Sequence, residues 1–241
     1  MFGYYYYYGF DVAYIALVLP CIILSIWASM RVNSTFKKYA QQLSSKRITG
    51  AQAAQRVLSE NGITNVTIER VSGNLTDHFD PRTNVIRLSD GVYDSTSTAA
   101  IGVACHEAGH AVQYARSYTP MRVRAAILPA ANIGSKLAMP LILLGLLFSY
   151  MGANASFELV YIGIALFALT LLFQLVTLPV EFNASRRALQ AIDQTQILTQ
   201  QERKGAKNVL SAAAMTYVAA AAVSLAQLLR LLMLFGNRRD D

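Results

Sequence analysis

Residues 98–112 read TAAIGVACHEAGHAV, and this stretch indicates the fold of the central part of the chain. It contains the pattern H-E-x-x-H, with His106 and His110 at its two ends. On a helix these two positions lie on one face, so both imidazoles can point toward a single metal ion. Glu107 lies about 100° further around the helix, within reach of a water on that ion. The pattern therefore predicts a metal-binding helix with a carboxylate beside the metal.

The residues around this motif are small and apolar, which predicts that the helix is buried. Residues 95–98 are Ser and Thr, which are preferred N-caps, so we expect the helix to run from about Thr98 to Arg116. Two buried imidazoles and a buried carboxylate are costly without a partner, and a metal supplies one. The alternative is a surface helix that carries two histidines by chance. Cys105 is an alternative zinc ligand, but it faces a different side of the helix from His106, which favours a small core residue there.

Residues 31 to about 120 indicate a soluble α+β unit around the motif. Thr49 is a plausible N-cap for a helix over residues 50–60, which Asn61-Gly62 would end. Three short strands are predicted at residues 66–70, 75–79 and 84–88, with a turn at residues 80–83. The third strand could offer an edge to an extended substrate, or it could be an ordinary sheet strand. Asp90-Gly91 is expected to end this stretch.

The composition indicates a membrane protein. The chain has 241 residues, of which 54% are hydrophobic and 15% charged, whereas about 25% are charged in an ordinary soluble domain. The net charge of +7 could suggest nucleic acid, but the basic residues cluster beside apolar stretches, as the positive-inside rule requires. We therefore expect a lipid bilayer and no nucleic acid as partner. Two cysteines provide no disulfide framework.

Apolar stretches long enough to cross a bilayer lie on both sides of the soluble unit. They cover residues 12–30, 125–151, 159–180 and 211–235, the second interrupted by Pro129, Lys136 and Pro140 and the last containing Arg230. The five tyrosines at residues 4–8 suit the membrane interface. Thr199 and Glu202 fit a capping box that opens the last helix. Whether that helix crosses the membrane or only packs against the others is left open.

Basic residues after the first apolar stretch place the N-terminus outside and residue 31 onward in the cytoplasm. We therefore predict a mainly α integral membrane protein with three to four transmembrane helices and a small α+β cytoplasmic zincin-like unit. Its predicted parts are residues 1–30 with the first transmembrane helix, 31–120 with the motif helix, and 121–241 as a membrane bundle.

A catalytic zinc ion normally takes three protein ligands, so a third ligand must lie elsewhere in the chain. His78 lies on a predicted strand, Glu158 is expected on the far side of the membrane, and Asp193 and Glu202 lie in a polar segment that we expect to be solvated. Glu181 follows the third apolar stretch directly. A carboxylate beside apolar residues at the membrane edge is unusual, which favours Glu181 as the ligand. The alternatives are a carboxylate that begins a helix or a partner for Arg186.

Residues 105–111 and 181–184 together resemble the membrane-embedded gluzincin peptidases, and most strongly the YugP-type neutral zinc metallopeptidases. HtpX and Ste24 proteases are similar to a lesser degree. Residues 77–82 and 85–89 also resemble the YugP type, so the resemblance covers nearly the whole chain. It implies Zn²⁺ bound by His106, His110 and Glu181, with Glu107 as general base. The more distant relatives carry an acidic residue about one turn after the third ligand, where it orients the ligands of the metal. The matching position here is Ser185, which we expect near the centre as a hydrogen-bonding partner without charge, so that another residue could take over this role.

The resulting hypothesis is a membrane-bound zinc-dependent endopeptidase of the gluzincin type, acting on membrane or membrane-proximal proteins. We expect it in the plasma (inner) membrane of a prokaryote, with the active site facing the cytoplasm. His78, Tyr114 and Arg186 are candidates to stabilise the transition state. A protease that cuts within the bilayer would need a distant aspartate, and no apolar stretch after the motif contains one. A further alternative is a non-catalytic scaffold or assembly factor stabilised by zinc, which would have no need of Glu107.

Overall fold

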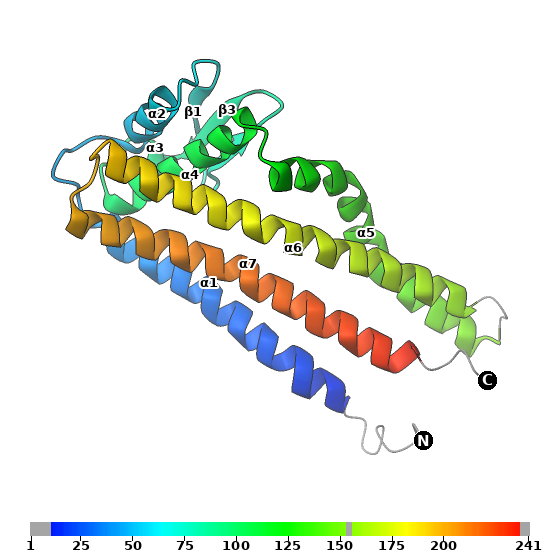
Figure 1. Cartoon of the computed structure of the whole chain (residues 1–241). Helices are drawn as coiled ribbons and strands as arrows, with labels where there is room; N and C mark the ends of the chain where they lie inside the picture. The colour runs from blue at the N-terminus through cyan, green and yellow to red at the C-terminus, as the bar shows by residue number, and fades with distance from the viewer. Residues whose placement is uncertain (1–10, 153–155, 237–241) are drawn as a thin grey trace. The chain divides into compact units, whose positions relative to one another are not determined.

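The computed structural model of the chain describes residues 11–152 and 156–236 (Figure 1). The five tyrosines at residues 4–8 lie outside the described residues. Contacts divide the chain into two compact units. The helical unit comprises Met1–Trp27, Val123–Val176 and Tyr217–Asp241, and the mixed unit comprises Ala28–Arg122 and Thr177–Thr216. Each unit thus joins segments that are far apart in the sequence, whereas the predicted parts are continuous segments.

Four helices in the described part of the chain are long and apolar enough to cross a membrane. The first begins as a π-helical turn, η1 (Tyr14–Val18), and continues as α1 (Leu19–Ala40); the others are α5 (Thr119–Tyr150), α6 (Ser156–Gln194) and α7 (Gln200–Phe235) (Figure 1). This finding confirms the prediction of a mainly helical membrane protein with three to four spans. It also makes the last apolar stretch as good a candidate span as the others.

Prolines do not interrupt these helices. α5 continues through Pro129 and Pro140, and α6 continues through Pro179 to Gln194. Glu181 therefore lies inside a helix, and the alternative of a carboxylate that begins a helix is wrong. Because α6 runs on past the apolar stretch, its residues from Thr177 onward can belong to the mixed unit.

Small residues allow close contact between α5 and α6 in the helical unit. A side chain on Gly163 would meet the carbonyl oxygen of Ala138 at 2.7 Å, and one on Gly134 would meet that of Leu166 at 2.8 Å. Close backbone approach at small residues is how membrane helices commonly pack. Arg230, the one charge predicted within the last apolar stretch, forms an ion pair with Asp11, and its Nε lies 2.6 Å from the carboxylate. This pair neutralises the arginine inside the helical unit.

The mixed unit contains a three-stranded sheet in the order β1-β3-β2. β1 (Thr67–Val71) pairs in parallel with β3 (Val85–Ser89), and β2 (His78–Asp80) pairs antiparallel with β3. Of the two alternatives for this third strand, an edge open to a substrate is wrong and an ordinary sheet strand is confirmed, because β3 is central and is paired on both sides. The second strand is also shorter than predicted, since Leu75 has a φ of 56° and leaves the extended conformation. A short helix, α3 (Asp90–Tyr93), follows β3 where we expected the chain to turn.

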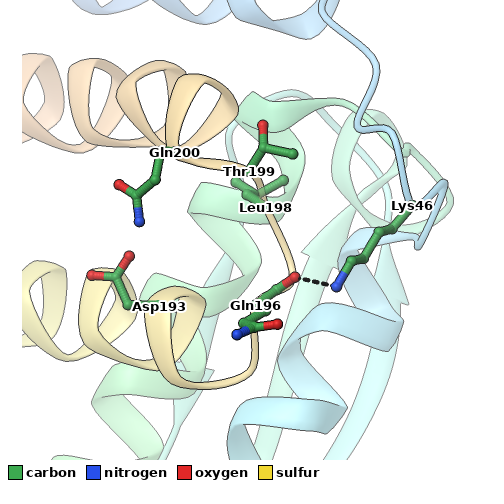
Figure 2. A pocket seen from close by; sticks show the side chains of 6 residues that line it. All are labelled: Lys46, Asp193, Gln196, Leu198, Thr199 and Gln200. Carbon is green, nitrogen blue, oxygen red and sulfur yellow. Dashed lines mark hydrogen bonds between the residues drawn. The ribbon is translucent and has the colours of Figure 1, made fainter.

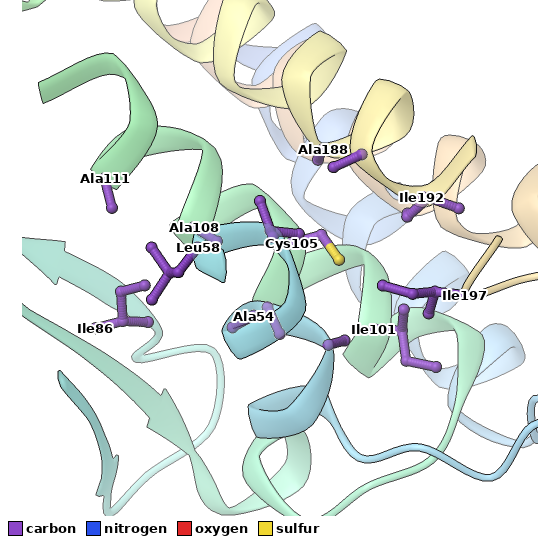
Figure 3. Close-up of a cluster of buried hydrophobic side chains, with 14 of the residues drawn as sticks. Ala54, Leu58, Ile86, Ile101, Cys105, Ala108, Ala111, Ala188, Ile192 and Ile197 are labelled. Atoms are coloured by element: carbon purple, nitrogen blue, oxygen red, sulfur yellow. The ribbon is translucent and has the colours of Figure 1, made fainter. Parts of the chain in front are cut away.

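Two helices cover the core of the mixed unit, and their ends are as predicted. α2 (Gly50–Glu60) begins with a capping box between Thr49 and Gln52, and Gly62 after it has a φ of 69°. α4 (Thr98–Ala115) begins at the N-cap Ser97, whose side chain accepts a hydrogen bond from the backbone of Ala100. Figure 3 shows side chains of α2, β3 and α4 packed together with Ala188 and Ile192 of α6. α6 is therefore part of the core that carries the motif helix.

The turn between α6 and α7 is bound to the segment that follows α1. The predicted capping box is present: the Thr199 backbone N–H donates to Glu202 at 2.8 Å, and the Glu202 N–H donates to Thr199 Oγ1 at 3.3 Å. Glu202 also accepts from the Ser45 backbone N–H at 2.7 Å. Glu202 is buried, so the expectation that it is solvated is wrong. Its carboxylate is occupied by these hydrogen bonds, which excludes it as a free metal ligand.

Candidate metal centre

His106, His110 and Glu181 lie together in the mixed unit. Nε2 of His106 is 3.3 Å from Glu181 Oε2, and Nε2 of His110 is 3.6 Å from the same oxygen. One ligand atom from each of the three residues lies within 4.8 Å of the other two. The two imidazole rings are 4.7 Å apart, edge to face. Three donors are thus directed to a common point.

The two histidines come from α4, where a spacing of four residues places them on one face. Glu181 comes from α6, and the close packing of α6 on α4 brings it there. Glycine at position 109 permits this packing, because a Cβ atom there would lie only 2.7 Å from the Ala184 carbonyl oxygen. Ala184 is about one helical turn after Glu181. Glu181 is consequently only 3% exposed.

In each imidazole Nε2 faces Glu181, and the other ring nitrogen, Nδ1 (the outer nitrogen), has a partner of its own. Ser185 Oγ lies 3.1 Å from His106 Nδ1, and Gln113 Oε1 lies 2.9 Å from His110 Nδ1. We expected Ser185 near the centre, whereas the sequence reasoning missed Gln113. The spacing could have shown it, since Gln113 follows His110 by three positions and so shares its helix face. Both partners leave the Nε2 atoms directed toward Glu181.

Glu107 is also buried, with only 8% of its surface exposed. Within residues 11–152 and 156–236 its carboxylate takes part in no hydrogen bond and no ion pair. Burial by itself lowers the pKa of His110, but the hydrogen bond to Glu181 and the negative charges of Glu107 and Glu181 outweigh it and raise that pKa. The centre therefore favours positive charge.

The other candidates from the sequence lie outside the group of three ligands. His78 is exposed on β2, and its Nδ1 lies 2.8 Å from the Thr76 carbonyl oxygen, to which it donates. Tyr114 is half exposed on α4, and its ring lies 5.9 Å from that of Phe79. Arg186 is exposed on α6, next to Ser185. Among the described residues, the group that could hold a metal ion contains Glu181 and not His78.

Cys105 lies in the core, away from the ligands. Figure 3 shows its sulfur among apolar side chains, near Ile101 and Ile197. Burial raises the pKa of the Cys105 thiol to about 12. A thiol with this pKa stays protonated at neutral pH, and only the thiolate is a good metal ligand. The expectation that Cys105 is a core residue agrees with this environment.

A cavity of about 350 Å³ lies at the turn between α6 and α7 (Figure 2). Lys46 and Asp193 are among its lining residues, and the Lys46 ammonium donates to the Gln196 carbonyl at 2.5 Å. Asp193 also pairs with Arg203 at 2.6 Å. No predicted site residue lines this cavity, so it is separate from the three ligands.

Comparison with known proteins bears on what this centre binds. The family described as "Putative neutral zinc metallopeptidase" matches residues 14–236, which is almost the whole chain. The chain is also 46% identical over 228 residues to a protein of Bacillus subtilis (strain 168) described as "Putative membrane protease YugP". That alignment covers 95% of this chain and 99% of the relative. The chain belongs to this family of zinc metallopeptidases. No solved structure matches it.

Family membership implies Zn²⁺ as the cofactor, and the residues at the centre fit that ion. Two imidazole nitrogens and one carboxylate are a common ligand set of catalytic zinc. The Nδ1 atoms are occupied by Gln113 and Ser185, as is usual for histidines whose Nε2 binds a metal. A buried carboxylate facing two imidazole nitrogens also favours a cation between them. His106, His110 and Glu181 would therefore hold the zinc ion of this metallopeptidase.

Proposed function

We propose that this protein is a membrane-bound endopeptidase of the gluzincin type, which hydrolyses peptide bonds of membrane or membrane-proximal proteins. The observation that carries the proposal is the position of Glu107. Glu107 is buried and follows the ligand His106 directly in α4, its charge acts on His110, and its carboxylate takes part in no hydrogen bond or ion pair with the described residues. A structural zinc site has no need of such a group, whereas hydrolysis requires a base there.

Each residue of the centre has a role in this proposal. His106, His110 and Glu181 hold zinc, which when bound supplies a Lewis acid and lowers the pKa of water. Glu107 accepts the proton of the water that attacks the scissile carbonyl and delivers it to the departing amine. Three protein ligands leave a coordination position open for chemistry, which distinguishes a catalytic from a structural zinc site.

A second polar group must stabilise the oxygen of the carbonyl under attack. Tyr114, His78 and Arg186 are the candidates that the sequence indicates. Tyr114 follows His110 by one helical turn on the same face of α4, and its side chain is half exposed. Tyr114→Phe would lower kcat and preserve zinc binding if the hydroxyl serves this role.

The proposed location is the plasma membrane, with the centre on the cytoplasmic side. Basic residues cluster directly after the first apolar stretch, at Arg31, Lys37, Lys38, Lys46 and Arg47. Such clusters mark the cytoplasmic side of a membrane protein. The motif helix follows in the same segment between spans, so it would share that side. Substrates would then be proteins whose exposed segments reach the inner membrane surface.

The test uses purified protein in detergent, with casein as substrate. The wild-type protein should hold about one zinc ion per chain and cleave casein, as a single three-ligand centre requires. Glu107→Gln should retain zinc and lose cleavage by at least roughly 100-fold, because general-base catalysis contributes that much. Glu60→Gln, at an exposed position of α2, is the matched control. Full activity of Glu107→Gln would contradict the proposal, and zinc binding without any cleavage would favour the scaffold.

A further inference from the structure

Gln113 is a polar side chain in the fully buried part of α4. Its exposed fraction is 0%, and both the nitrogen and the oxygen of its side-chain amide have hydrogen-bonding partners. The side-chain nitrogen donates to the Val180 carbonyl at 2.8 Å and to Asn183 Oδ1 at 3.0 Å. The side-chain oxygen lies 2.9 Å from His110 Nδ1. One amide group thus contacts a metal ligand on α4 and the backbone of α6.

The orientation of this amide follows from its partners. A backbone carbonyl such as that of Val180 can only accept a hydrogen bond, so the group facing it must be the NH₂ of Gln113. The oxygen of Gln113 therefore faces His110, and an amide oxygen also can only accept. The Nδ1 atom of His110 must then carry a proton and donate it.

Asn183 strengthens this orientation. Its side-chain oxygen accepts from Gln113 and also from Arg187 Nε at 2.8 Å. Two donors hold that oxygen in place, so the asparagine amide is not free to reverse. The chain of hydrogen bonds runs from Arg187 through Asn183 and Gln113 to His110, and every donor in it faces an acceptor.

Resting on the function proposed above, we infer that Gln113 is the positioning residue of the metal centre. It holds the proton of His110 on Nδ1, which leaves Nε2 as the nitrogen available to a metal. Through the Val180 carbonyl it also holds the segment of α6 that carries Glu181, the next residue along. One side chain therefore positions a ligand from each of the two helices.

Ser185 cannot fix the tautomer of His106 as Gln113 fixes that of His110. A hydroxyl is both donor and acceptor, so its contact of 3.1 Å with His106 Nδ1 permits either tautomer of that ring. Of the two outer contacts, only the one made by Gln113 selects a tautomer. The two histidines should therefore respond differently to loss of their partners, and Gln113 should matter more for metal binding.

Two substitutions separate the two functions of this side chain. Gln113→Met removes both the acceptor for His110 and the donor to α6, with little change in volume. Gln113→Glu retains an acceptor for His110 and removes the donor to Val180. Gln55→Met, at an exposed position of α2, is the matched control. Circular dichroism and gel filtration in detergent establish that each variant folds.

The readouts are zinc affinity by competition with a chelator and the ring N–H signals of ¹⁵N-histidine in the zinc-loaded protein. The chain has three histidines: His78→Ala assigns the signal of His78, and the signal that shifts in Ser185→Ala belongs to His106, which leaves that of His110. Gln113→Met should weaken zinc binding by roughly 10- to 100-fold, as is usual for residues that orient a metal ligand. It should also shift the Nδ1–H signal of His110. Gln113→Glu should retain that signal, with a smaller loss of affinity.

The outcomes distinguish this inference from the proposed function. If the wild-type protein bound zinc and cleaved casein while Gln113→Met matched it in affinity and in the His110 signal, Gln113 would not be a positioning residue, and the proposed function would stand. If both Gln113 variants lost stability but kept the wild-type His110 signal, the role would be structural only, which overturns the inference. If the wild-type protein bound no zinc, both would be overturned.

Discussion

The α-carbon of Gly109 faces the backbone of Ala184 so closely that a methyl group on it would lie 2.7 Å from the Ala184 carbonyl oxygen. The contact joins the motif helix α4 to α6 between two ligands of the proposed metal centre. His110 follows Gly109 directly, and Glu181 precedes Ala184 by about one turn. The separation of the two helices at this point therefore determines whether Glu181 can reach the imidazoles.

Gly109→Ala should impair the centre although it alters no ligand. The added methyl group meets backbone that cannot move by side-chain rotation, so α6 must shift away from α4. Overpacking of this kind costs about 1–3 kcal/mol of unfolding free energy, and a shifted Glu181 should bind zinc more weakly. Thermal unfolding and chelator competition measure the two effects. Gly91→Ala is the control, because a Cβ atom there meets nothing within 4 Å; equal behaviour of the two variants would contradict the role of the contact.

Glu181→Ala should lose zinc, whereas His78→Ala should retain it. Glu181 is the buried carboxylate between the two imidazoles, and His78 is exposed on β2 with its Nδ1 bonded to Thr76. Removal of one of three protein ligands leaves too few to hold zinc against dialysis. Metal analysis of the two purified variants gives the answer. The reverse pattern would exclude Glu181 as the third ligand.

Cys105 should be unreactive in the folded protein despite its position next to His106. Its thiol is buried, and its pKa is raised to about 12 by that burial, so almost no thiolate is present at pH 8. In a Cys21→Ser background, iodoacetamide should label the protein only after denaturation. Cys105→Ala should retain zinc with wild-type affinity. Rapid labelling of the native protein, or loss of zinc in the alanine variant, would place the sulfur at the metal.

The orientation in the membrane can be tested with a cysteine at Ser34, which is exposed on α1 after the first apolar stretch. If the basic residues that follow this stretch are cytoplasmic, a membrane-impermeant maleimide should not label Ser34→Cys on intact cells. Glu158→Cys, in the first turn of α6 and expected on the outer side of the membrane, should be labelled. A Cys21→Ser background keeps the labelling specific, since Cys105 is buried. Labelling of Ser34→Cys but not of Glu158→Cys would show the opposite orientation and contradict the proposal.

Local elements of the fold could be predicted well because their signals lie within a few residues. Thr49 caps the helix that it was expected to begin, and Thr199 forms the expected capping box with Glu202. Each cap depends on contacts between residues three positions apart. The N-cap Ser97 and the long apolar stretches of the candidate spans are also local features of this kind. Such features depend mainly on neighbouring residues, so the sequence indicates them directly.

Features that depend on pairing between distant segments could not be predicted in the same way. Whether β3 lay at an edge or inside the sheet was open from the sequence, because the order of strands depends on which segments pair, and β3 is central. Glu202 was expected in solvent and is buried, because the segment around Ser45 lies against it. The spacing could have indicated that Gln113 lies beside His110, but its contacts with Val180 and Asn183 on another helix could not be predicted.

The sequence by itself determined that His106 and His110 share one face of a buried helix with Glu107 beside them, because the geometry of an α-helix follows from spacing alone. It also determined the membrane spans, because a long apolar stretch is unstable in water. Only the tertiary structure brought Glu181 to the imidazoles and placed Gln113 between α4 and α6. Those contacts require two helices to approach at Gly109, and that approach depends on packing between segments that the sequence keeps far apart.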